Sequence, residues 1–499
     1  MGRPQDGSEQ GAAELRTGRI RGQRVKGGPF KGQRHFPEHE QATSPSQRVP
    51  RSKDPVPLKE PSPPSGVASA DNPPPGDNKN PVVFFRYDPS GQTGQKQLTD
   101  AADISGAEGI RNVILLSGNW YCDYSLDAGV TWKRKDPTKV FPNLAGGFCC
   151  DQVVTYVSSI DRWVWLLQYQ KDANGGAFRL AVASTAGIRK NFDTAWTYWD
   201  FRTTNFGEVT GNDMDYPDLS FSDQFLFLST DMQSSVGRLV ARIPLKDLAS
   251  GGTINFGYVD PSQIQNCWGD HLVQSSTDGA YWVGHVDNST LQIFSMPDAS
   301  NTVTWKQVKV HAWPQGTLSS KGPNGNDWLA KENSFPEYAV IGGTRLGNRL
   351  WLAWTASPGN DGKGGFKFSN THVRVAEVDL GTYTTTSEMQ IWNPDYAFAY
   401  PSLAHNARGE IAVILGWGGK NDNADAAMGI IGDYVVWYQN GSTMTTQRWG
   451  DYVTVRPSQR NEGMFSGFGY YTVKDNNDTT KAYYDPYYVL FGRSSLGGP

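Results

Sequence analysis

The sequence lacks the features that would tie it to a membrane, to nucleic acid or to several common enzyme classes. Its 499 residues contain no apolar run of about 18 residues, so no membrane-spanning helix is predicted. The net charge of −4 argues against a nucleic-acid-binding surface, which needs an excess of Lys and Arg. No G-x-S-x-G elbow, Walker loop or H-E-x-x-H helix occurs. The serine hydrolases, nucleotide-binding proteins and zinc proteases that carry these motifs are therefore excluded.

Cysteine is scarce as well. The four cysteines are too few for a disulfide scaffold and lack the C-x-x-C spacing of a metal site; they are Cys122, Cys149, Cys150 and Cys267. Cys149 and Cys150 are adjacent. We expect them to be buried as small apolar residues, with a vicinal disulfide as the alternative.

Residues 1–80 differ in composition from the rest of the chain. They contain 13 Lys and Arg against nine Asp and Glu, and their aromatic residues are Phe30 and Phe36. So little apolar surface cannot offset the entropy lost on ordering, so a disordered tail is predicted. Its basic run from Arg16 to Arg34 is expected to be solvated, with contact to acidic partners as the alternative. No apolar core follows the basic start, as a secretory signal would require. The body nevertheless favours an extracellular or cell-envelope location, and a cytoplasmic one stays open.

Residues 81–495 have the composition of a single large β-domain. Over the whole chain, 55 Gly and 30 Pro suit many turns between short strands, and 17 Trp, 22 Tyr and 22 Phe supply a core. Val82–Tyr87 reads as a strand, and we expect it to pair with Tyr487–Phe491 near the C-terminus. Such a pairing would close a circular fold and remove its exposed edges.

A five-residue pattern recurs six times in this domain. It consists of an aromatic residue or Cys, a small or kinked residue, usually a carboxylate, and a short β-forming run. The copies start 49 to 67 residues apart, and they lie at Cys149–Val153, Tyr216–Ser220, Trp268–Leu272, Phe335–Ala339, Tyr400–Ala404 and Trp449–Val453. Repetition on this scale predicts a β-propeller of six or seven four-stranded antiparallel blades with long loops.

The repeat also predicts where acidic side chains meet. If each copy opens the innermost strand of a blade, one end of the channel carries a ring of carboxylates: Asp151, Asp218, Asp270, Glu337 and Asp451. Ser402 is the gap in this ring. Clustered carboxylates need a cation, an Arg or raised pKa values. In one interpretation they serve a carbohydrate site; in the other, each Asp accepts hydrogen bonds from the backbone N–H groups of a neighbouring strand.

The carbohydrate interpretation assigns roles to particular residues. Paired carboxylates suit glycoside hydrolysis, and the predicted catalytic residues are Asp218, Asp270, Glu337 and Asp451. Rings and polar groups near the pattern are the predicted substrate-binding residues, namely Tyr216, Trp268, His271, Phe335, Tyr400, Trp449 and Tyr452. Oxygen ligands would also suit Ca²⁺, with Asp151, Asp218, Asp270 and Asp451 as its predicted ligands.

Ser125-Leu126-Asp127-Ala128-Gly129-Val130-Thr131-Trp132 resembles the Asp box, S-x-D-x-G-x-T-W, of the sialidase-like (BNR-repeat) propellers. The resemblance implies a hairpin in which Asp127 accepts backbone hydrogen bonds, Gly129 takes a positive φ and Trp132 packs between strands. It marks the fold and implies no catalytic residue. The substrate arginine of true sialidases lies in an early Arg-Ile-Pro motif. The Arg242-Ile243-Pro244 of this chain ends a mid-chain strand instead, so sialidase activity is not predicted.

Two functions follow from these patterns and stay open. The first is a carbohydrate-active propeller, hydrolytic or lyase-like, that acts at the channel mouth. The second is a non-catalytic propeller that binds glycan or protein, with carboxylates that are structural or bind Ca²⁺. In both, the expected partner is a carbohydrate or glycoconjugate, and the chain is expected to be a monomer.

Overall fold

The structure is a computed structural model of the whole chain. It describes residues 10–28, 30–31, 102–207, 213–232, 238–259, 269–330, 338–360, 366–433, 441–475 and 482–493. For 65–66, 68–70, 82–87, 268 and 435–438 it describes the backbone alone. Within these ranges, no helix is both long enough and apolar enough to cross a membrane.

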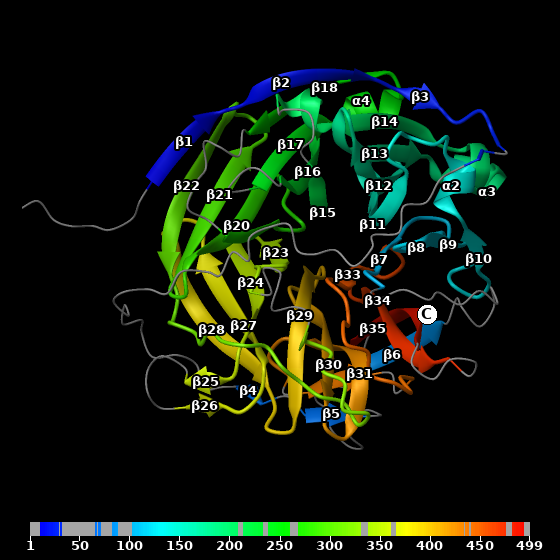
Figure 1. Cartoon of the computed structure of the whole chain (residues 1–499). Helices are drawn as coiled ribbons and strands as arrows, with labels where there is room; N and C mark the ends of the chain where they lie inside the picture. Colours follow the sequence, from blue (N-terminus) through cyan, green and yellow to red (C-terminus); the bar gives the residue numbers. More distant parts are fainter. Residues whose placement is uncertain are drawn as a thin grey trace, which may run out of the picture.

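The chain forms a β-propeller, in which antiparallel sheets surround one axis (Figure 1). Each of the first four sheets contains one set of four consecutive strands, which we call a strand set. The first contains β7 (Ser105–Glu108), β8 (Ile114–Gly118), β9 (Tyr121–Ser125) and β10 (Lys133–Lys135). The second contains β11 (Phe148–Val157), β12 (Arg162–Asp172), β13 (Gly175–Ala183) and β14 (Thr197–Arg202). The third contains β15 (Met214–Phe221), β16 (Phe225–Met232), β17 (Arg238–Pro244) and β18 (Thr253–Val259). The fourth contains β19 (Trp268–Leu272), β20 (Gly279–Asp287), β21 (Thr290–Pro297) and β22 (Thr302–Lys309).

Two further sheets complete the circle. The fifth contains β23 (Gly342–Leu346), β24 (Arg349–Ala356), β27 (His372–Asp379) and β28 (Thr384–Trp392), with β4 (Ser65–Gly66) beside β28. The sixth has nine strands: β29 (Tyr396–His405), β30 (Ile411–Gly419), β31 (Asp422–Ile430), β32 (Val435–Tyr438), β33 (Thr454–Pro457), β34 (Phe465–Lys474), β35 (Ala482–Arg493), β5 (Ala68–Ala70) and β6 (Val82–Tyr87). In it, two strand sets meet at one residue pair, Asp425 and Tyr471. The described residues therefore form a propeller of six large sheets, the lower of the two predicted blade counts, and the sixth sheet holds two strand sets.

Short elements connect the strands. They are the helices α2 (Pro137–Val140), α3 (Thr185–Lys190) and α4 (Leu245–Ser250), the 3-10 turns η1 (Ser158–Ile160), η2 (Phe192–Thr194) and η3 (Thr203–Phe206), and the hairpin of β25 (Gly359–Asn360) and β26 (Lys367–Phe368). The first strands of the strand sets contact one another in a closed ring around the axis, in the order β7, β11, β15, β19, β23, β29, β33 and back to β7.

The repeated pattern marks a β-bulge at the start of the inner strands. The pairing register shifts between Phe148 and Gln152 in β11, and at the same place in β15, β19 and β29. At each bulge one residue has a positive φ. Where the second position is Cys or Gly, that residue takes it, as at Cys150 (26°) and Gly269 (60°). Where the second position is Pro, whose ring holds φ negative, the preceding tyrosine takes it, as at Tyr216 (50°) and Tyr400 (57°).

The Asp-box segment forms the turn between β9 and β10. The backbone N–H of Thr131 donates to Asp127 Oδ1 at 2.8 Å, and Gly129 has a φ of 92°. The buried Trp132 donates from its indole N–H to the Gly129 carbonyl at 2.7 Å. The predicted hairpin geometry is thus confirmed for this segment.

Cys149 and Cys150 form a vicinal disulfide in β11. Both are also buried, as the sequence predicts, so the structure joins the two interpretations. Gln170 donates from its amide to Cys149 Sγ at 3.0 Å.

The predicted disordered tail is wrong for its first described part, because residues 10–24 form strands. β1 (Gln10–Glu14), β2 (Arg16–Arg21) and β3 (Gln23–Arg24) run along the outer edges of three sheets and pair with β22, β18 and β14 (Figure 1). Gly11 lies opposite Trp305, and Gly18 opposite Phe256. The segment buries few side chains of its own. The blades supply the apolar surface instead, and the glycines leave room for their rings, which composition alone does not reveal.

The predicted closure of the circle is confirmed, because β6 pairs with β35 along Val82–Tyr87. The buried Glu108 carboxylate of β7 joins the first and last strand sets a second time. Ser458 Oγ donates to it at 2.6 Å and Ser466 Oγ at 2.8 Å, and Arg460 forms an ion pair with it. One carboxylate therefore holds groups that lie about 350 residues away in sequence.

We predict that Gly18→Val weakens the outer strand segment, because a Cβ at this position would overlap the Phe256 ring. The melting temperature should fall, and limited proteolysis should cut within residues 10–28 sooner. Ala12→Val is the matched control, since Ala12 is exposed on β1. Equal stability of the two variants would contradict this packing.

We predict that Glu108→Gln destabilises the protein by about 3 kcal/mol, because it leaves the Arg460 charge without its buried partner. Glu377→Gln removes a more exposed pair with Arg349 and should cost less than about 1 kcal/mol. Denaturant unfolding of both variants checks the difference. A Glu108→Gln variant as stable as the control would show that the circle does not depend on this carboxylate.

Candidate functional site

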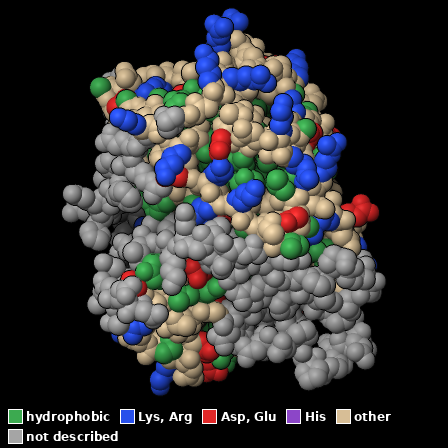
Figure 2. All heavy atoms as spheres, turned by 90° about the vertical axis from the view of Figure 1, so that its right-hand side faces the viewer, with side chains coloured by type: hydrophobic (Ala, Val, Ile, Leu, Met, Phe, Trp, Pro, Cys, Tyr) green, Lys and Arg blue, Asp and Glu red, His purple; other side chains and the backbone are tan. Residues whose placement is uncertain are grey.

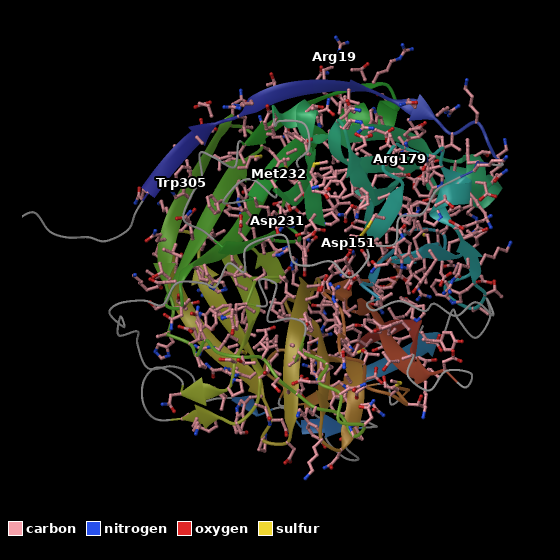
Figure 3. The ribbon with its side chains drawn as sticks, in the orientation of Figure 1. Arg19, Asp151, Arg179, Asp231, Met232 and Trp305 are labelled. Atoms are coloured by element: carbon pink, nitrogen blue, oxygen red, sulfur yellow. A yellow bond between two sulfur atoms is a disulfide. The ribbon has the colours of Figure 1, made fainter. Side chains whose placement is uncertain are left out.

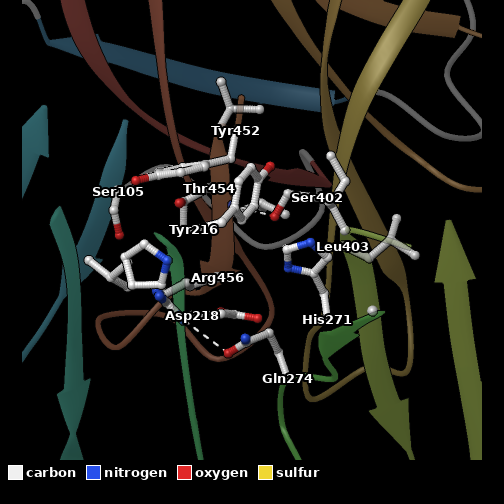
Figure 4. Close-up of a pocket in the computed structure, with 16 residues that line it drawn as sticks. Ser105, Tyr216, Asp218, His271, Gln274, Ser402, Leu403, Tyr452, Thr454 and Arg456 are labelled. Atoms are coloured by element: carbon white, nitrogen blue, oxygen red, sulfur yellow. Dashed lines mark hydrogen bonds between the residues drawn. The ribbon is translucent and has the colours of Figure 1, made fainter. Parts of the chain in front are cut away.

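A cavity of about 70 Å³ lies on the propeller axis, at the inner strands. Its walls come from β7, β11, β15, β19, β23, β29 and β33. The polar and aromatic lining includes Ser105, Tyr216, Asp218, His271, Gln274, Ser402, Tyr452, Thr454 and Arg456 (Figure 4). This volume holds a few water molecules or one polar substituent of a larger ligand.

Asp218 is the carboxyl group of the cavity wall. It occupies the third position of the repeated pattern, directly after the bulge of β15. The backbone N–H of Leu219 donates to Oδ1 at 2.8 Å, and that of Leu272, on the neighbouring inner strand, donates to Oδ2 at 3.0 Å. Burial raises the pKa of Asp218 to about 6, although the nearby Arg238 charge opposes this shift. Asp218 therefore exchanges its proton close to neutral pH.

His271 and two tyrosines form the aromatic side of the cavity. The Tyr216 ring lies 4.8 Å from the His271 ring and 5.7 Å from the Tyr452 ring, with an edge-to-face geometry in both pairs. Burial, followed by the Arg238 charge, holds the pKa of His271 well below its usual range. The imidazole is thus neutral at pH 7, when one ring nitrogen donates and the other accepts a hydrogen bond.

Arg456 brings a cation to the opposite side of the cavity. It donates to the carbonyls of Gly106 (2.9 Å) and Val154 (3.1 Å) and to Gln274 Oε1 (3.3 Å). These acceptors are neutral. Burial lowers the pKa of Arg456 to about 10, and the charge of Asp218 opposes this shift. The guanidinium stays protonated at neutral pH and faces the same space as Asp218 (Figure 4).

The predicted carboxylate ring separates into two groups. Asp151 and Asp451 lie near Tyr216 and Tyr452. Burial raises the pKa of both tyrosines, and the charges of Asp151, Asp451 and Asp103 add to this shift. Figure 3 shows Asp151 and Asp231 close to the axis. Asp218 and Asp270 belong to a second group, around the buried Arg238. Glu337 lies outside the described residues.

Asp451 has a structural environment. Arg448 donates to its Oδ2 at 2.6 Å, and its backbone N–H donates to Asp103 Oδ1 at 2.7 Å, across the junction of the last and first strand sets. The carboxyl group of Asp103 is buried, and burial together with the Asp451 charge raises its pKa. We conclude that this pair closes the circle, and the predicted catalytic role of Asp451 gains no support.

Asp270 is 3% exposed, and its Oδ2 has no hydrogen-bond partner among the described residues. Burial raises the pKa of Asp270 to about 7, although Arg238 opposes this shift. It lies beside His271 in the chain and does not line the described cavity. Arg238 itself donates to Asp231 Oδ1 at 3.0 Å, and the Asp231 side chain is 41% exposed.

The predicted substrate-binding aromatics also differ in position. Tyr216, His271 and Tyr452 line the cavity. Tyr400 and Trp449 do not fit the prediction, because they are 6% and 0% exposed and stack on each other at 5.4 Å. Trp328 packs against both, so these rings belong to the core. Phe335 and the side chain of Trp268 lie outside the described residues.

The predicted calcium ligands do not converge. Across the described ranges, no three His, Cys, Asp or Glu side chains lie close enough together to hold a metal ion. Asp151, Asp218, Asp270 and Asp451 therefore offer no shared cation site in this part of the chain.

Sequence reasoning missed Arg456, Gln274, Asp103, Arg238 and Asp231. Arg456 lies on the inner strand β33 and Gln274 just after the inner strand β19, each a few residues beyond a copy of the pattern. The alternation of side chains along a strand could have indicated that both face the axis. Asp103 follows two alanines, so the aromatic residue that marks the other copies is missing. Arg238 and Asp231 lie on second and third strands, and their approach to the axis depends on side-chain length and packing.

Comparisons with known proteins indicate distant likenesses in fold. No family model matches the chain, and no curated protein matches it in sequence. The GH93 α-L-arabinofuranosidase of Fusarium graminearum in complex with arabinobiose is 10% identical, with a TM-score of 0.36 over 83% of this chain and 98% of that one. AofleA from Arthrobotrys oligospora is 10% identical, with a TM-score of 0.36 over 76% and 94%. The Dos1 propeller is 9% identical, with a TM-score of 0.36 over 82% and 95%. These values are too low to carry an argument about activity.

We predict that Asp270→Asn removes part of the pH dependence of stability. A folded-state pKa raised from 3.8 to about 7 contributes stability that is present below pH 3.8 and is lost as the pH rises through 7. The variant should be more stable than the wild type at pH 8, by on the order of 4 kcal/mol in the free energy of unfolding, and similarly stable at pH 4. Thermal melts across this range check it.

Asp379→Asn is the control with the opposite sign. Backbone N–H groups of Thr382 and Gly381 lower the pKa of Asp379, so its loss should destabilise the protein at neutral pH. If both variants respond to pH alike, the buried proton on Asp270 is contradicted.

Proposed function

We propose that the protein is a carbohydrate-active propeller that cleaves a glycosidic bond at the axial cavity. The observation that carries the proposal is the meeting of the Asp218 carboxyl group, a neutral imidazole and two tyrosine rings around one small polar space. Sugars bind where such rings and hydrogen-bonding groups converge. The small volume suits one substituent of a sugar, and the rest of the saccharide would lie outside the cavity.

Asp218 supports the role of proton donor. A glycosidase acid must hold a proton near working pH, and burial raises the pKa of this group to about 6. Its two oxygens accept the backbone N–H groups of Leu219 and Leu272, which hold the carboxyl group in place. As the acid it would donate that proton to the leaving oxygen of the glycosidic bond.

A second carboxylate has to be ionised. It would either take a proton from the water that bonds to the anomeric carbon, or bond to that carbon itself before water replaces it. Asp231 is the candidate for this role, because its side chain is partly exposed and pairs with Arg238 at 3.0 Å. Burial raises the pKa of Asp231, and the Arg238 charge opposes this shift and favours the carboxylate. Its pair with a buried arginine fixes the carboxylate near the inner strands. Asp270, which holds its proton near neutral pH, serves less well as the ionised partner.

Neutral hydrogen-bonding groups around the cavity would orient the sugar. Ser402, Gln274 and His271 face it from three inner-strand regions. Arg456 faces the same space and would bind a hydroxyl or a ring oxygen of the substrate.

A screen of aryl glycosides and plant and fungal oligosaccharides tests the proposal. Asp218→Asn should lower kcat by at least about 100-fold, because the proton donor is lost. The melting temperature should fall as well, since the single amide oxygen of Asn cannot accept from both Leu219 and Leu272, so kcat is compared at a temperature where both proteins are folded. Wild-type activity should fall as the pH rises through about 6, where Asp218 loses its proton. Asp223→Asn, an exposed position on the same sheet, is the control and should retain activity.

Several outcomes would overturn the proposal. Binding of a glycan without turnover would favour the non-catalytic alternative, and neither binding nor turnover would reject both. Running the assays with EDTA tests the calcium prediction, since a loss that added Ca²⁺ restores would support it.

A further inference from the structure

The outer strand segment presents a row of positive charge that the axial site does not use. Between residues 15 and 37 the sequence has seven Lys and Arg and no Asp or Glu. The six within the described residues are all exposed, and we call them the basic strip: Arg16, Arg19, Arg21, Arg24, Lys26 and Lys31. Figure 3 shows Arg19 pointing away from the outer rim.

Strand geometry holds Arg19 and Arg21 on one face of β2, whereas Arg16 belongs to the opposite face by the same alternation. In β2, Arg19 and Arg21 are exposed while Ile20 between them packs on the core of the third sheet. Alternate residues of a strand stand about 6.7 Å apart on one face. Pairing of β2 with β18 and of β3 with β14 fixes the backbone, so a ligand need not order it.

Five of the six side chains of the basic strip form no ion pair among the described residues: Arg19, Arg21, Arg24, Lys26 and Lys31. Arg16 does have an interaction partner and is not one of these five. Two acids lie near the strip. Asp247 accepts from the backbone N–H of Asn255, the strand partner of Arg19, and Glu14 ends β1, two residues before Arg16. Figure 2 shows Lys and Arg side chains gathered over the upper part of the side toward which β3 leads.

We propose that the basic strip binds a linear, carboxylated polysaccharide, that is, a polyuronate. The choice of a polysaccharide rests on the proposed carbohydrate function. Four of the six side chains are arginines, whose planar guanidinium matches a carboxylate through two parallel hydrogen bonds. A row one strand wide fits a single extended polyanion. Binding there would hold the polymer on the protein and raise its local concentration at the axial cavity.

Nucleic acid fits the strip less well. Single-stranded nucleic acid gains affinity by stacking its bases on aromatic rings. The rings beneath the segment, Trp199 and Phe256, are buried, and the exposed large apolar residues of the described ranges are Ile110 and Val130. A wider duplex would meet the rest of the chain, which is strongly acidic: the total is −4 and residues 15–37 contribute +7, leaving −11.

Binding to polygalacturonate, measured without turnover, tests the inference. The triple variant R19Q/R21Q/R24Q should bind at least tenfold more weakly than the wild type at low salt. A complex with fewer charge contacts releases fewer counterions when it forms. The slope of log K against log salt should therefore become shallower by about 2. The control K321Q/K367Q/K420Q removes the same charge at exposed lysines elsewhere and should bind as the wild type does.

Further binding measurements distinguish a polyuronate site from a site for other polyanions, and distinguish this inference from the proposed function. Tighter binding to sulfated dextran or to a single-stranded oligonucleotide of matched charge would overturn the polyuronate assignment. Equal weakening in both triple variants would overturn the strip as a site. D218N should still bind the polymer through the strip, so a failure of the proposed catalysis leaves this result intact. Thermal melts should show that both triple variants remain folded.

Discussion

The structure depends on hydrogen bonds between the inner strands, which form a closed ring around the axis. At several junctions a side chain of one inner strand accepts from the backbone of the next: Ser105 from Val154, Asp218 from Leu272, and Ser402 from Val455. At the junction of the chain's two ends, Asp103 accepts from Asp451. Inner strands carry unpaired backbone groups toward the axis, and a short polar side chain satisfies them where no further strand can. The ring therefore requires polar residues in its most buried layer.

This requirement is also the origin of the candidate site. Polar groups placed between blades lose water, so burial raises the pKa of Asp218 to about 6 and that of Asp270 to about 7, and it holds the pKa of His271 well below its usual range. The structural and the chemical interpretations of the acidic repeat are thus compatible for Asp218. It accepts a hydrogen bond from a neighbouring strand and still lines the cavity. Asp451 has the structural role without the access.

Packing outside the ring divides the molecule into a rigid interior and a charged rim. Aromatic side chains fill the space between sheets, and the N-terminal strands lie over several of them through glycines. A segment with almost no apolar side chains can therefore be ordered, because the blades supply the apolar surface. Its exposed Lys and Arg side chains carry charge at the surface.

The sequence by itself determined the repeat, the propeller and the closure of its ends, because a bulge pattern and a strand propensity are local properties. It also indicated the Asp-box turn and the position of Asp218, Tyr216 and His271 near the axis. The tertiary structure alone decided that Tyr400 and Trp449 are core, since Trp328 from a distant segment covers them. It likewise decided that Arg456 and Arg238 reach the acids and that residues 10–24 are strands. These outcomes depend on long side chains and on surfaces of other blades, which no local pattern in the sequence encodes.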